Sequence, residues 1–324
     1  MRIFHRGWTH LLVLLLATLP FMAAAGANDP APSARNPGAT KMERPRIALV
    51  LSGGGAKGSA HIGVLKVLEA KHIPVDIIVG TSMGSYVAGM YAMGLSAEEV
   101  ERTTLAIDWN KGYQDKVGRD ELSLRKKQQT EKYQLRTDIG VNGDQTQLPH
   151  GFFQGQSMAS LLRHATSNLP AQKSFDNLPI PYRAVATDME TVTPFVLDHG
   201  SLAKAMQASM SIPGALKPVD WDGRILADGG TVNNMPVDVA KAMGADVVIA
   251  VDISAKLRTR ESLKSGLAMI DQLTTYMTQV GTEKQKALLG PRDILLTPEF
   301  GNMGIADFAL MPEGIKIGEA VANS

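Results

Sequence analysis

Short apolar runs alternate with amphipathic segments from residue 46 onward. The runs "RIALVLS", "VDIIVGT", "YRAVATD", "RILADGG", "DVVIAVDIS" and "DILLTP" have the length and composition of buried strands. The first is followed by "SAHIGVLKVLEAK", which places Ile62, Leu65 and Leu68 at helical spacing, and the second by the helical "SMGSYVAGMYAMG". Strands that alternate with helices form a mainly parallel sheet covered on both faces. The pattern therefore predicts a three-layer α/β fold.

A second helix candidate covers residues 261–289 and carries one apolar stripe. Such a stripe is typical of a helix face that packs on the core. A dimer contact and a membrane-facing surface are the alternatives. The stripe consists of Leu263, Leu267, Ile270, Leu273, Met277 and Val280.

The segment 111–147 is highly charged and has little apolar periodicity. We expect a solvated excursion from the domain that contains a helix and a hairpin. Long insertions in compact domains are often lids, so a mobile cap over a functional site is the alternative.

The N-terminus has the layout of a secretory signal peptide. Arg2 and Arg6 precede "LLVLLLATLPFMAAAGA", which ends in small residues with an A-x-A pattern. A membrane anchor is the competing interpretation, but Pro20 and the alanine-rich end favour cleavage. We expect a signal peptide at 1–27, a Pro- and Ala-rich linker at 28–45 and one domain at 46–324. The protein is thus predicted to be exported to the periplasm or secreted, with membrane association as an option.

Charge and cysteine content exclude several classes of function. The 33 Lys and Arg residues nearly balance 32 Asp and Glu residues, which argues against nucleic acid as the main partner. The chain has no cysteine, so thiol nucleophiles, thiolate metal sites and disulfides are excluded. No His-rich ligand set is present either, and neither a metal nor an organic cofactor is implied.

Three consecutive glycines stand where the first strand meets its helix, in "LSGGGAKGSA". A P-loop is excluded because Lys57 precedes Gly58 instead of following it. The spacing of a dinucleotide-binding turn is present, but Asp76 stands at the wrong end of the next strand to bind a ribose. A nucleotide-binding oxidoreductase therefore remains a weak alternative.

The next strand ends in "GTSMG", which has the G-x-S-x-G pattern of a nucleophile elbow around Ser82. Adjacent parallel strands bring both turns to the same carboxyl edge of the sheet. The backbone amides of Gly53, Gly54 and Gly55 are then placed to hold the oxyanion that forms when Ser82 attacks a carbonyl.

The serine needs a base, and the histidines do not supply an obvious one. No histidine follows "RILADGG", where a triad histidine is expected, and His61 is explained equally well by helix packing. Asp228 ends an apolar strand and is followed by two glycines, so it is the better candidate, although an ordinary Asp-Gly turn explains it too. An aspartate normally titrates near pH 3.9, so a sheltered environment must raise its pKa.

Four blocks in this order resemble the bacterial patatin-like phospholipases: "SGGGAKGSAHIGVL", "GTSMGS", "ASMSIPGALKPV" and "LADGGTVNNMPV". The stretch "RDELSLRKKQQ…LPHGFFQGQSM" resembles the branch related to neuropathy target esterase. The resemblance implies a patatin-like fold in which Ser82 is the nucleophile and Asp228 its only base. It also implies an oxyanion hole from Gly53, Gly54 and Gly55, and a substrate-binding role for Lys57 where the family commonly has Arg.

The resemblance further implies an exported lipid acyl hydrolase, similar to phospholipase A or lysophospholipase. Its substrate is then a phospholipid or lysophospholipid, reached through transient contact with a membrane surface. A catalytically silent lipid-binding protein on the same fold is the alternative. The oligomeric state is left open, with a homodimer as one option. We expect Pro213 and Pro218 to shape the acyl pocket wall, and Asn233 and Asn234 to satisfy backbone groups beside Asp228.

Overall fold

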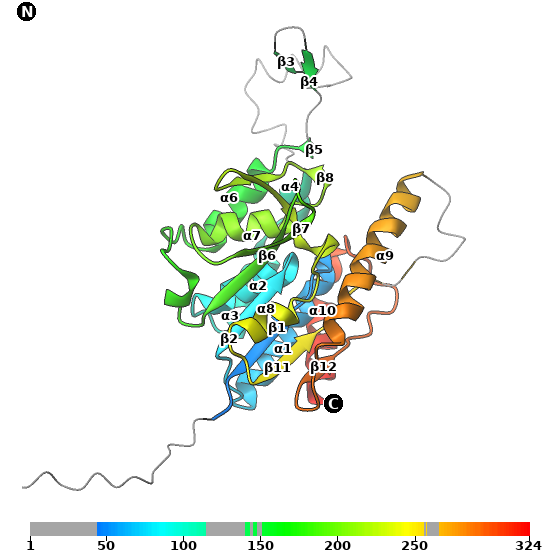
Figure 1. The fold of residues 1–324 in the computed structure, drawn as a ribbon. Coiled ribbons are helices and arrows are strands. Elements are labelled where there is room, and N and C mark those ends of the chain that lie inside the picture. Colours follow the sequence, from blue (N-terminus) through cyan, green and yellow to red (C-terminus); the bar gives the residue numbers. More distant parts are fainter. Residues whose placement is uncertain (1–43, 115–139, 143–144, 148–150, 256, 258–265) are drawn as a thin grey trace, which may run out of the picture. The chain divides into compact units, whose positions relative to one another are not determined.

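The central sheet of the computed structural model is built from the strands that the apolar runs predict (Figure 1). The structure describes residues 44–114, 140–142, 145–147, 151–255, 257 and 266–324. Five parallel strands lie in the order β12-β11-β1-β2-β6. Their bounds are β1 Ile47–Leu51, β2 Ile77–Thr81, β6 Tyr182–Asp188, β11 Val247–Val251 and β12 Ile294–Leu296.

Antiparallel strands also pair with β6, which the alternating pattern did not predict. Strands β7 (Thr193–Leu197) and β10 (Arg224–Asp228) both pair antiparallel with β6, and β9 (Val219–Trp221) pairs antiparallel with β10. The sheet is therefore mainly parallel, as expected, but the strand that ends at Asp228 runs in the opposite direction to its neighbour.

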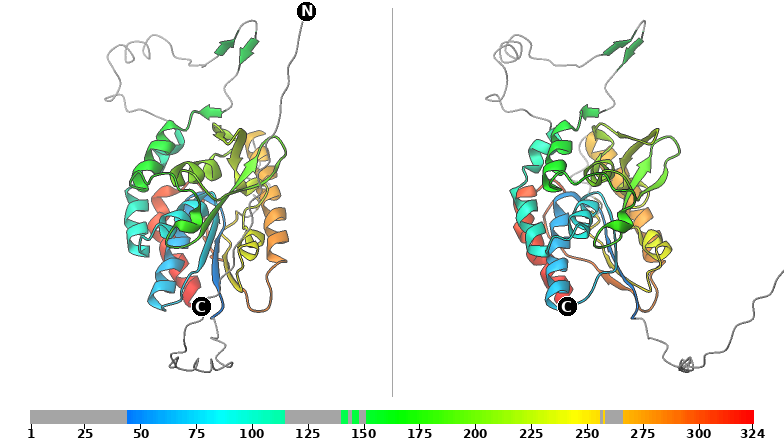
Figure 2. Two further views of the ribbon diagram at one scale, coloured as in Figure 1. Left: turned by 60° about the vertical axis from the view of Figure 1, so that its left-hand side comes forward. Right: turned by 90° about the vertical axis from the view of Figure 1, so that its left-hand side faces the viewer.

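Helices cover both faces of the sheet, which confirms the three-layer prediction (Figure 2). Leu49, Leu51 and Ile78 point into one core, with the helices α1, α2, α7 and α10, while Ala48 and Val50 point into a second core with α8. Neighbouring residues of a strand face opposite sides, so one buried strand serves both cores. The described helices are α1 Ser59–Ala70, α2 Met83–Ala92, α3 Ala97–Ala106, α4 Trp109–Gln114, α6 Gln156–Ala165, α7 Leu202–Met210, α8 Val237–Ala242, α9 Gly266–Lys286 and α10 Met311–Asn323.

Short elements complete the described part of the chain. The predicted hairpin in the charged segment is confirmed, since β3 (Gly140–Asn142) pairs antiparallel with β4 (Gln145–Gln147). Residues 115–139 of that segment, on which the lid interpretation depends, lie outside the described residues. The other short elements are β5 Gly151–Phe153, which pairs with β8 Gly214–Leu216, and the 3-10 turns η1 Gly55–Gly58, η3 Phe175–Asn177, η4 Gly229–Thr231 and η6 Phe308–Leu310.

The apolar stripe of α9 faces outward, and the prediction that it packs on the core is wrong for its described side chains. Leu273 is 64% exposed, and Met277 and Val280 are exposed as well. The helix instead turns a polar face with Thr275, Thr278 and Thr282 toward the body, because two cavities lie beneath it. The side chains of Leu263, Leu267 and Ile270 lie outside those that the structure describes.

The compact unit starts at Arg44, two residues before the predicted domain start. The Arg44 guanidinium lies 2.6 Å from Asp76, whose carboxylate also accepts the amide of Ile47 at 2.8 Å. These contacts account for Asp76 as a structural residue at the start of the sheet. The predicted signal peptide and linker up to residue 43 lie outside the described residues. No helix in the described ranges has the length and apolar character needed to cross a bilayer.

Candidate active site

Ser82 occupies a sharp turn between β2 and α2. Its backbone angles are φ 53° and ψ −127°, a combination that is strained for a residue with a side chain. The turn is held from below, since the Ser82 amide donates to Ser209 Oγ at 2.8 Å and Ser209 Oγ donates to the Val185 carbonyl at 2.6 Å. A Cβ atom at Gly84 would collide with the Leu51 carbonyl, so the first turn of α2 packs directly on β1. The strand-turn-helix context predicted for the elbow is confirmed.

Ser82 and Asp228 form a direct, buried hydrogen bond. Ser82 Oγ donates to Asp228 Oδ2 at 2.7 Å, and each residue is only 7% exposed. The second carboxylate oxygen accepts the Gly230 amide at 2.8 Å. Burial raises the pKa of Asp228 to about 6, and the bonds from Ser82 and Gly230 limit the rise. The carboxylate is thus ionised at neutral pH but far more basic than an exposed aspartate.

The register of the sheet explains how β10 delivers Asp228 from the opposite direction. Thr81, the last residue of β2, lies opposite Val185 of β6, and Asp228 lies opposite Ala186. Because β7 pairs with residues 184–188 along the other edge of β6, β2 and β10 lie on the same edge of β6 and meet there end to end. The chain then passes close to both β6 and β2, since a Cβ atom at Gly229 would collide with the Val185 carbonyl and lie 3.1 Å from Thr81 Cγ2. Glycine is thus required at position 229 by this close contact.

The glycine turn lies directly against the nucleophile. A Cβ atom at Gly53 would lie 2.9 Å from Ser82 Cβ and 2.6 Å from Asn234 Oδ1, so only glycine fits. The Gly53 amide donates to the Asn234 carbonyl at 3.2 Å. Among the described residues, the amides of Gly54 and Gly55 have no hydrogen-bond partner. The turn therefore offers two N–H donors beside Ser82, at Gly54 and Gly55.

A largely apolar cavity of about 360 Å³ opens above Ser82 and Asp228. Ile212 and Pro213 form one wall, as expected for Pro213, whereas Pro218 is not among the residues that line the cavity. Tyr113 stacks on Phe308 with ring centroids 5.7 Å apart, and both rings line the cavity. Burial, together with the Asp228 charge, raises the pKa of Tyr113, which stays a neutral phenol. The cavity has the size and lining of a site for an aliphatic chain.

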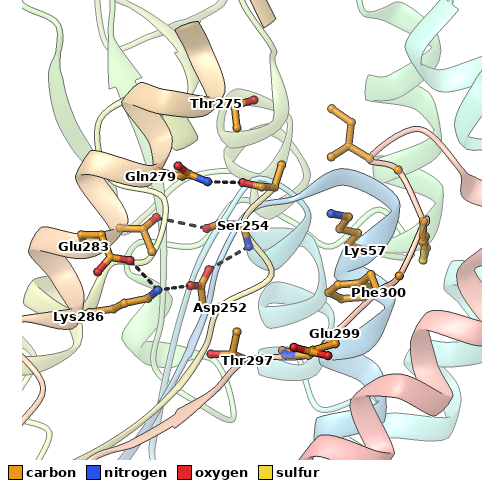
Figure 3. Close-up of a pocket in the computed structure, with 17 residues that line it drawn as sticks. Lys57, Asp252, Ser254, Thr275, Gln279, Glu283, Lys286, Thr297, Glu299 and Phe300 are labelled. Carbon is orange, nitrogen blue, oxygen red and sulfur yellow. Dashed lines mark hydrogen bonds and ion pairs between the residues drawn. The ribbon is translucent and has the colours of Figure 1, made fainter. Parts of the chain in front are cut away.

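Lys57 lines a second cavity of about 670 Å³ (Figure 3). Its side chain points into the space between α9 and the segment after β12, with Nζ 5.3 Å from the centre of the Phe300 ring. On the opposite wall, Lys286 Nζ lies 2.8 Å from Asp252 and 2.8 Å from Glu283. The two cavities adjoin, because Ala255, Thr275 and Ile305 line both.

No histidine is among the residues that line the two cavities. His61 is fully buried on α1, its Nε2 lies 2.8 Å from the Ser52 carbonyl, and burial lowers its pKa to about 4. Asn234 donates to the Gly53 carbonyl at 3.1 Å, as expected for a residue that satisfies backbone groups. Asn233 differs, since its side-chain amide donates to Asp238 Oδ1 at 2.9 Å.

Three residues of the site were given no role by the sequence motifs. Ser209 supports the Ser82 amide, but a serine inside a helix gives no indication of its partner. Tyr113 lies at the start of the charged segment 111–147, and Phe308 lies far along the chain in a region without a recognised motif. Only the folded chain brings these side chains to Ser82.

Comparison with known proteins assigns the family. The family model described as patatin-like phospholipase matches residues 49–241, more than half of the chain. The mouse "patatin-like phospholipase domain-containing protein 6" is 35% identical over 215 residues, which are 66% of this chain and 14% of that protein. An uncharacterized NTE family protein of Mycobacterium bovis is 32% identical over 211 residues, which are 65% of this chain and 49% of that protein.

Among solved structures, VipD from Legionella pneumophila matches with 15% identity and a TM-score of 0.42, over 87% of this chain and 66% of that one. The chain thus corresponds to about a seventh of the mouse relative's length and about half of the mycobacterial relative's. The match of the family model spans the glycine turn, Ser82 and Asp228. The chain belongs to the patatin-like phospholipase family.

Proposed function

We propose that the protein is a lipid acyl hydrolase of the phospholipase A or lysophospholipase type. The observation that carries this proposal is the 2.7 Å bond between Ser82 Oγ and the buried Asp228 carboxylate, at the floor of an apolar cavity. The family assignment supports the same chemistry. An aliphatic chain fits the cavity, and an ester carbonyl at its floor lies next to both the nucleophile and the glycine turn.

The reaction follows from the positions of these groups. Ser82 Oγ attacks the ester carbonyl carbon while its proton passes to Asp228, and the amides of Gly54 and Gly55 hold the resulting oxyanion. The tetrahedral intermediate collapses, the bond to the alcohol oxygen breaks, and that oxygen takes the proton from Asp228. Asp228 then removes a proton from water, which attacks the acyl-serine carbonyl carbon. The second tetrahedral intermediate collapses, its bond to Ser82 Oγ breaks, Ser82 Oγ takes the proton back from Asp228, and the fatty acid leaves. The pKa of about 6 suits both proton transfers.

In this proposal, the polar headgroup of the lipid binds in the second cavity, which Lys57 lines. Lys57 follows the glycine turn by two residues and faces charged and polar side chains, whereas the Ser82 cavity is mostly apolar. The ester therefore sits between an acyl compartment and a polar compartment that share Thr275 and Ile305. Lys57→Met is expected to lower turnover of a phospholipid about tenfold, and to leave a phosphate-free ester of the same acyl chain nearly unaffected.

Export and transient membrane contact are further parts of the proposal. The N-terminal pattern at 1–27 supports export, and the outward apolar face of α9 supports contact with a lipid surface. We define the α9 surface as the side chains of Leu273, Tyr276, Met277 and Val280. They lie along one face of the helix, and all are exposed. Thr275 and Thr278 of the same helix line the Ser82 cavity, so the helix lies between that cavity and the outward surface.

The direct test is covalent labelling with a fluorophosphonate probe, read by peptide mass spectrometry. We expect a single adduct on Ser82, absent in Ser82→Ala and formed much more slowly in Asp228→Asn. Ser85→Ala is the matched control, since Ser85 is also buried on α2 and its hydroxyl donates to the Ser82 carbonyl at 2.7 Å, outside the cavity. It should keep the adduct. If wild-type protein binds fatty acid but forms no adduct, the alternative of a catalytically silent lipid-binding protein is favoured.

A further inference from the structure

The glycine turn is fixed by clamps on two successive peptide planes. A trans peptide is planar, so its C=O and the following N–H point in opposite directions. Fixing the carbonyl of one residue therefore fixes the direction of the next amide. In this turn, the carbonyls of Ser52 and Gly53 are both held by buried side chains.

The first clamp is His61. Its Nε2 lies 2.8 Å from the Ser52 carbonyl, and since a carbonyl only accepts, this nitrogen carries the proton. The peptide between Ser52 and Gly53 is thereby oriented, and at its other end the Gly53 amide donates to the Asn234 carbonyl at 3.2 Å. The His61 ring is neutral at physiological pH, because burial lowers its pKa to about 4. This clamp thus keeps its proton arrangement over the working range.

The second clamp is the side chain of Asn234. Its Nδ2 donates to the Gly53 carbonyl at 3.1 Å and to Ser254 Oγ at 3.1 Å, and Ser254 Oγ is 3.3 Å from Thr282 Oγ1 of α9. The Gly53 carbonyl fixes the orientation of the amide group, since the amide oxygen of Asn234 could not bond to a carbonyl. Asn234 is 2% exposed and lines the Ser82 cavity. Asn234 thus holds the Gly53–Gly54 peptide by its carbonyl oxygen.

We propose that Asn234 is a positioning residue that aims the Gly54 N–H at the oxyanion, with His61 orienting the preceding peptide. With the Gly53 carbonyl pinned to Asn234, the Gly54 N–H must point the opposite way, away from Asn234. Gly54 lines the same cavity as Ser82, and its amide has no other partner among the described residues. The inference rests on the proposed function, because the oxyanion exists only if Ser82 attacks a carbonyl.

The chain offers a matched control at the neighbouring position. Asn233 is equally buried and lies in the same loop as Asn234. Its side chain donates a hydrogen bond to Asp238 and does not reach the glycine turn. Asn233→Ala and Asn234→Ala therefore remove the same atoms from similar surroundings. Asn234→Asp adds a second comparison, since it keeps the shape of the side chain but turns an oxygen toward the Gly53 carbonyl.

The experiment measures kcat and KM for a soluble acyl ester, and the rate of fluorophosphonate labelling, in wild type and these three variants. Loss of one oxyanion donor typically costs about 10²- to 10³-fold in kcat, so a misaimed donor should cost about 10- to 100-fold. We expect Asn234→Ala and Asn234→Asp to lose kcat and labelling rate by that factor with KM within twofold. Asn233→Ala should stay within threefold of wild type in kcat.

Hydrogen exchange at residues 53–56 supplies a readout that does not depend on activity. The amides of the turn should exchange at least fivefold faster in Asn234→Ala than in wild type or Asn233→Ala. Equal exchange in the two alanine variants, or wild-type kcat in Asn234→Asp, would overturn the inference. If wild type neither turns over ester nor labels at Ser82, the proposed function fails, and hydrogen exchange alone still decides whether Asn234 holds the turn.

Discussion

At the scale of single residues, we expect the burial of Asp228 to set the pH dependence of the proposed activity. Only the ionised carboxylate can accept the Ser82 proton, and burial raises its pKa to about 6. We expect kcat/KM for a soluble ester to fall tenfold per pH unit below about pH 6, with an acid limb that reports the free enzyme. An exposed aspartate would place this limb near pH 4. A kcat/KM that stays constant from pH 8 down to pH 5 would contradict the sheltered base.

The same burial makes Asp228 costly for stability. Its pKa is higher in the folded protein than in the unfolded chain, so the folded state loses stability as pH rises from about 4 through 6. Asp228→Asn removes this cost and should raise the free energy of unfolding by about 2 kcal/mol at pH 7.5, with no gain at pH 4. Urea unfolding at the two pH values measures the difference.

Asp252 is the control for this prediction because its shift has the opposite sign. Although burial raises its pKa, the bonds from Lys286 and Ser254 prevail and hold it below the ordinary value. The ionised carboxylate therefore stabilises the folded protein above the unfolded pKa, and this contribution is lost as pH falls through the folded value. Asp252→Asn should destabilise the protein at pH 7.5 and have little effect at low pH. A loss of stability in Asp228→Asn at pH 7.5 would contradict the assigned cost.

At the scale of elements, the sequence predicted which segments form strands and helices better than how they are oriented. Strand β6 occupies the predicted "YRAVATD". A short apolar run of this kind is stable only inside the sheet, where both of its faces are buried. The direction of β10 was not predicted, since nothing in "RILAD" encodes which way it pairs with β6. The motifs placed Ser82 and Asp228 together, whereas the packing of Tyr113 and Ser209 depends on tertiary contacts between distant segments.

Helix α9 shows why a hydrophobic stripe does not by itself identify the core. Its apolar and polar faces are clear from periodicity, but the side that meets the body is decided by what lies beneath. Here the body offers two cavities, and Thr275, Thr282 and Lys286 line them. The apolar face is left outside, which a core packing rule alone would not have given.

The contact between α1 and α10 depends on glycine on both helices. A Cβ atom at Gly318 would collide with the Ala60 carbonyl, and one at Gly63 with the Ile315 carbonyl. Gly318→Ala should therefore push α10 from α1 and lower the free energy of unfolding by about 1–3 kcal/mol, as overpacking does. Gly290→Ala is the control, because the nearest atom to its new Cβ is Asp293 Oδ2 at 3.7 Å. Denaturant unfolding of both variants measures the effect, and equal stabilities would contradict the close packing.

At the scale of the whole molecule, one edge of the sheet gathers the chemistry. The glycine turn follows β1, Ser82 follows β2 and Asp252 follows β11, and parallel strands present these ends together. Helix α9 borders both cavities at this edge with polar side chains. Its remaining face is apolar and exposed, an arrangement that fits a lipid aggregate as the source of substrate.

The α9 surface provides the corresponding prediction. The double variant Leu273→Gln, Met277→Gln removes two of its exposed apolar side chains without touching either cavity. We expect turnover of a soluble ester to stay within twofold of wild type, while turnover of phospholipid vesicles and sedimentation with them fall about tenfold, because apolar area no longer enters the lipid. Leu105→Gln is the control, since Leu105 is exposed on α3, across the sheet from α8. Equal losses in the control would contradict a specific lipid contact, and a change of solution mass from dimer to monomer in the double variant would show that a second copy covers this face instead.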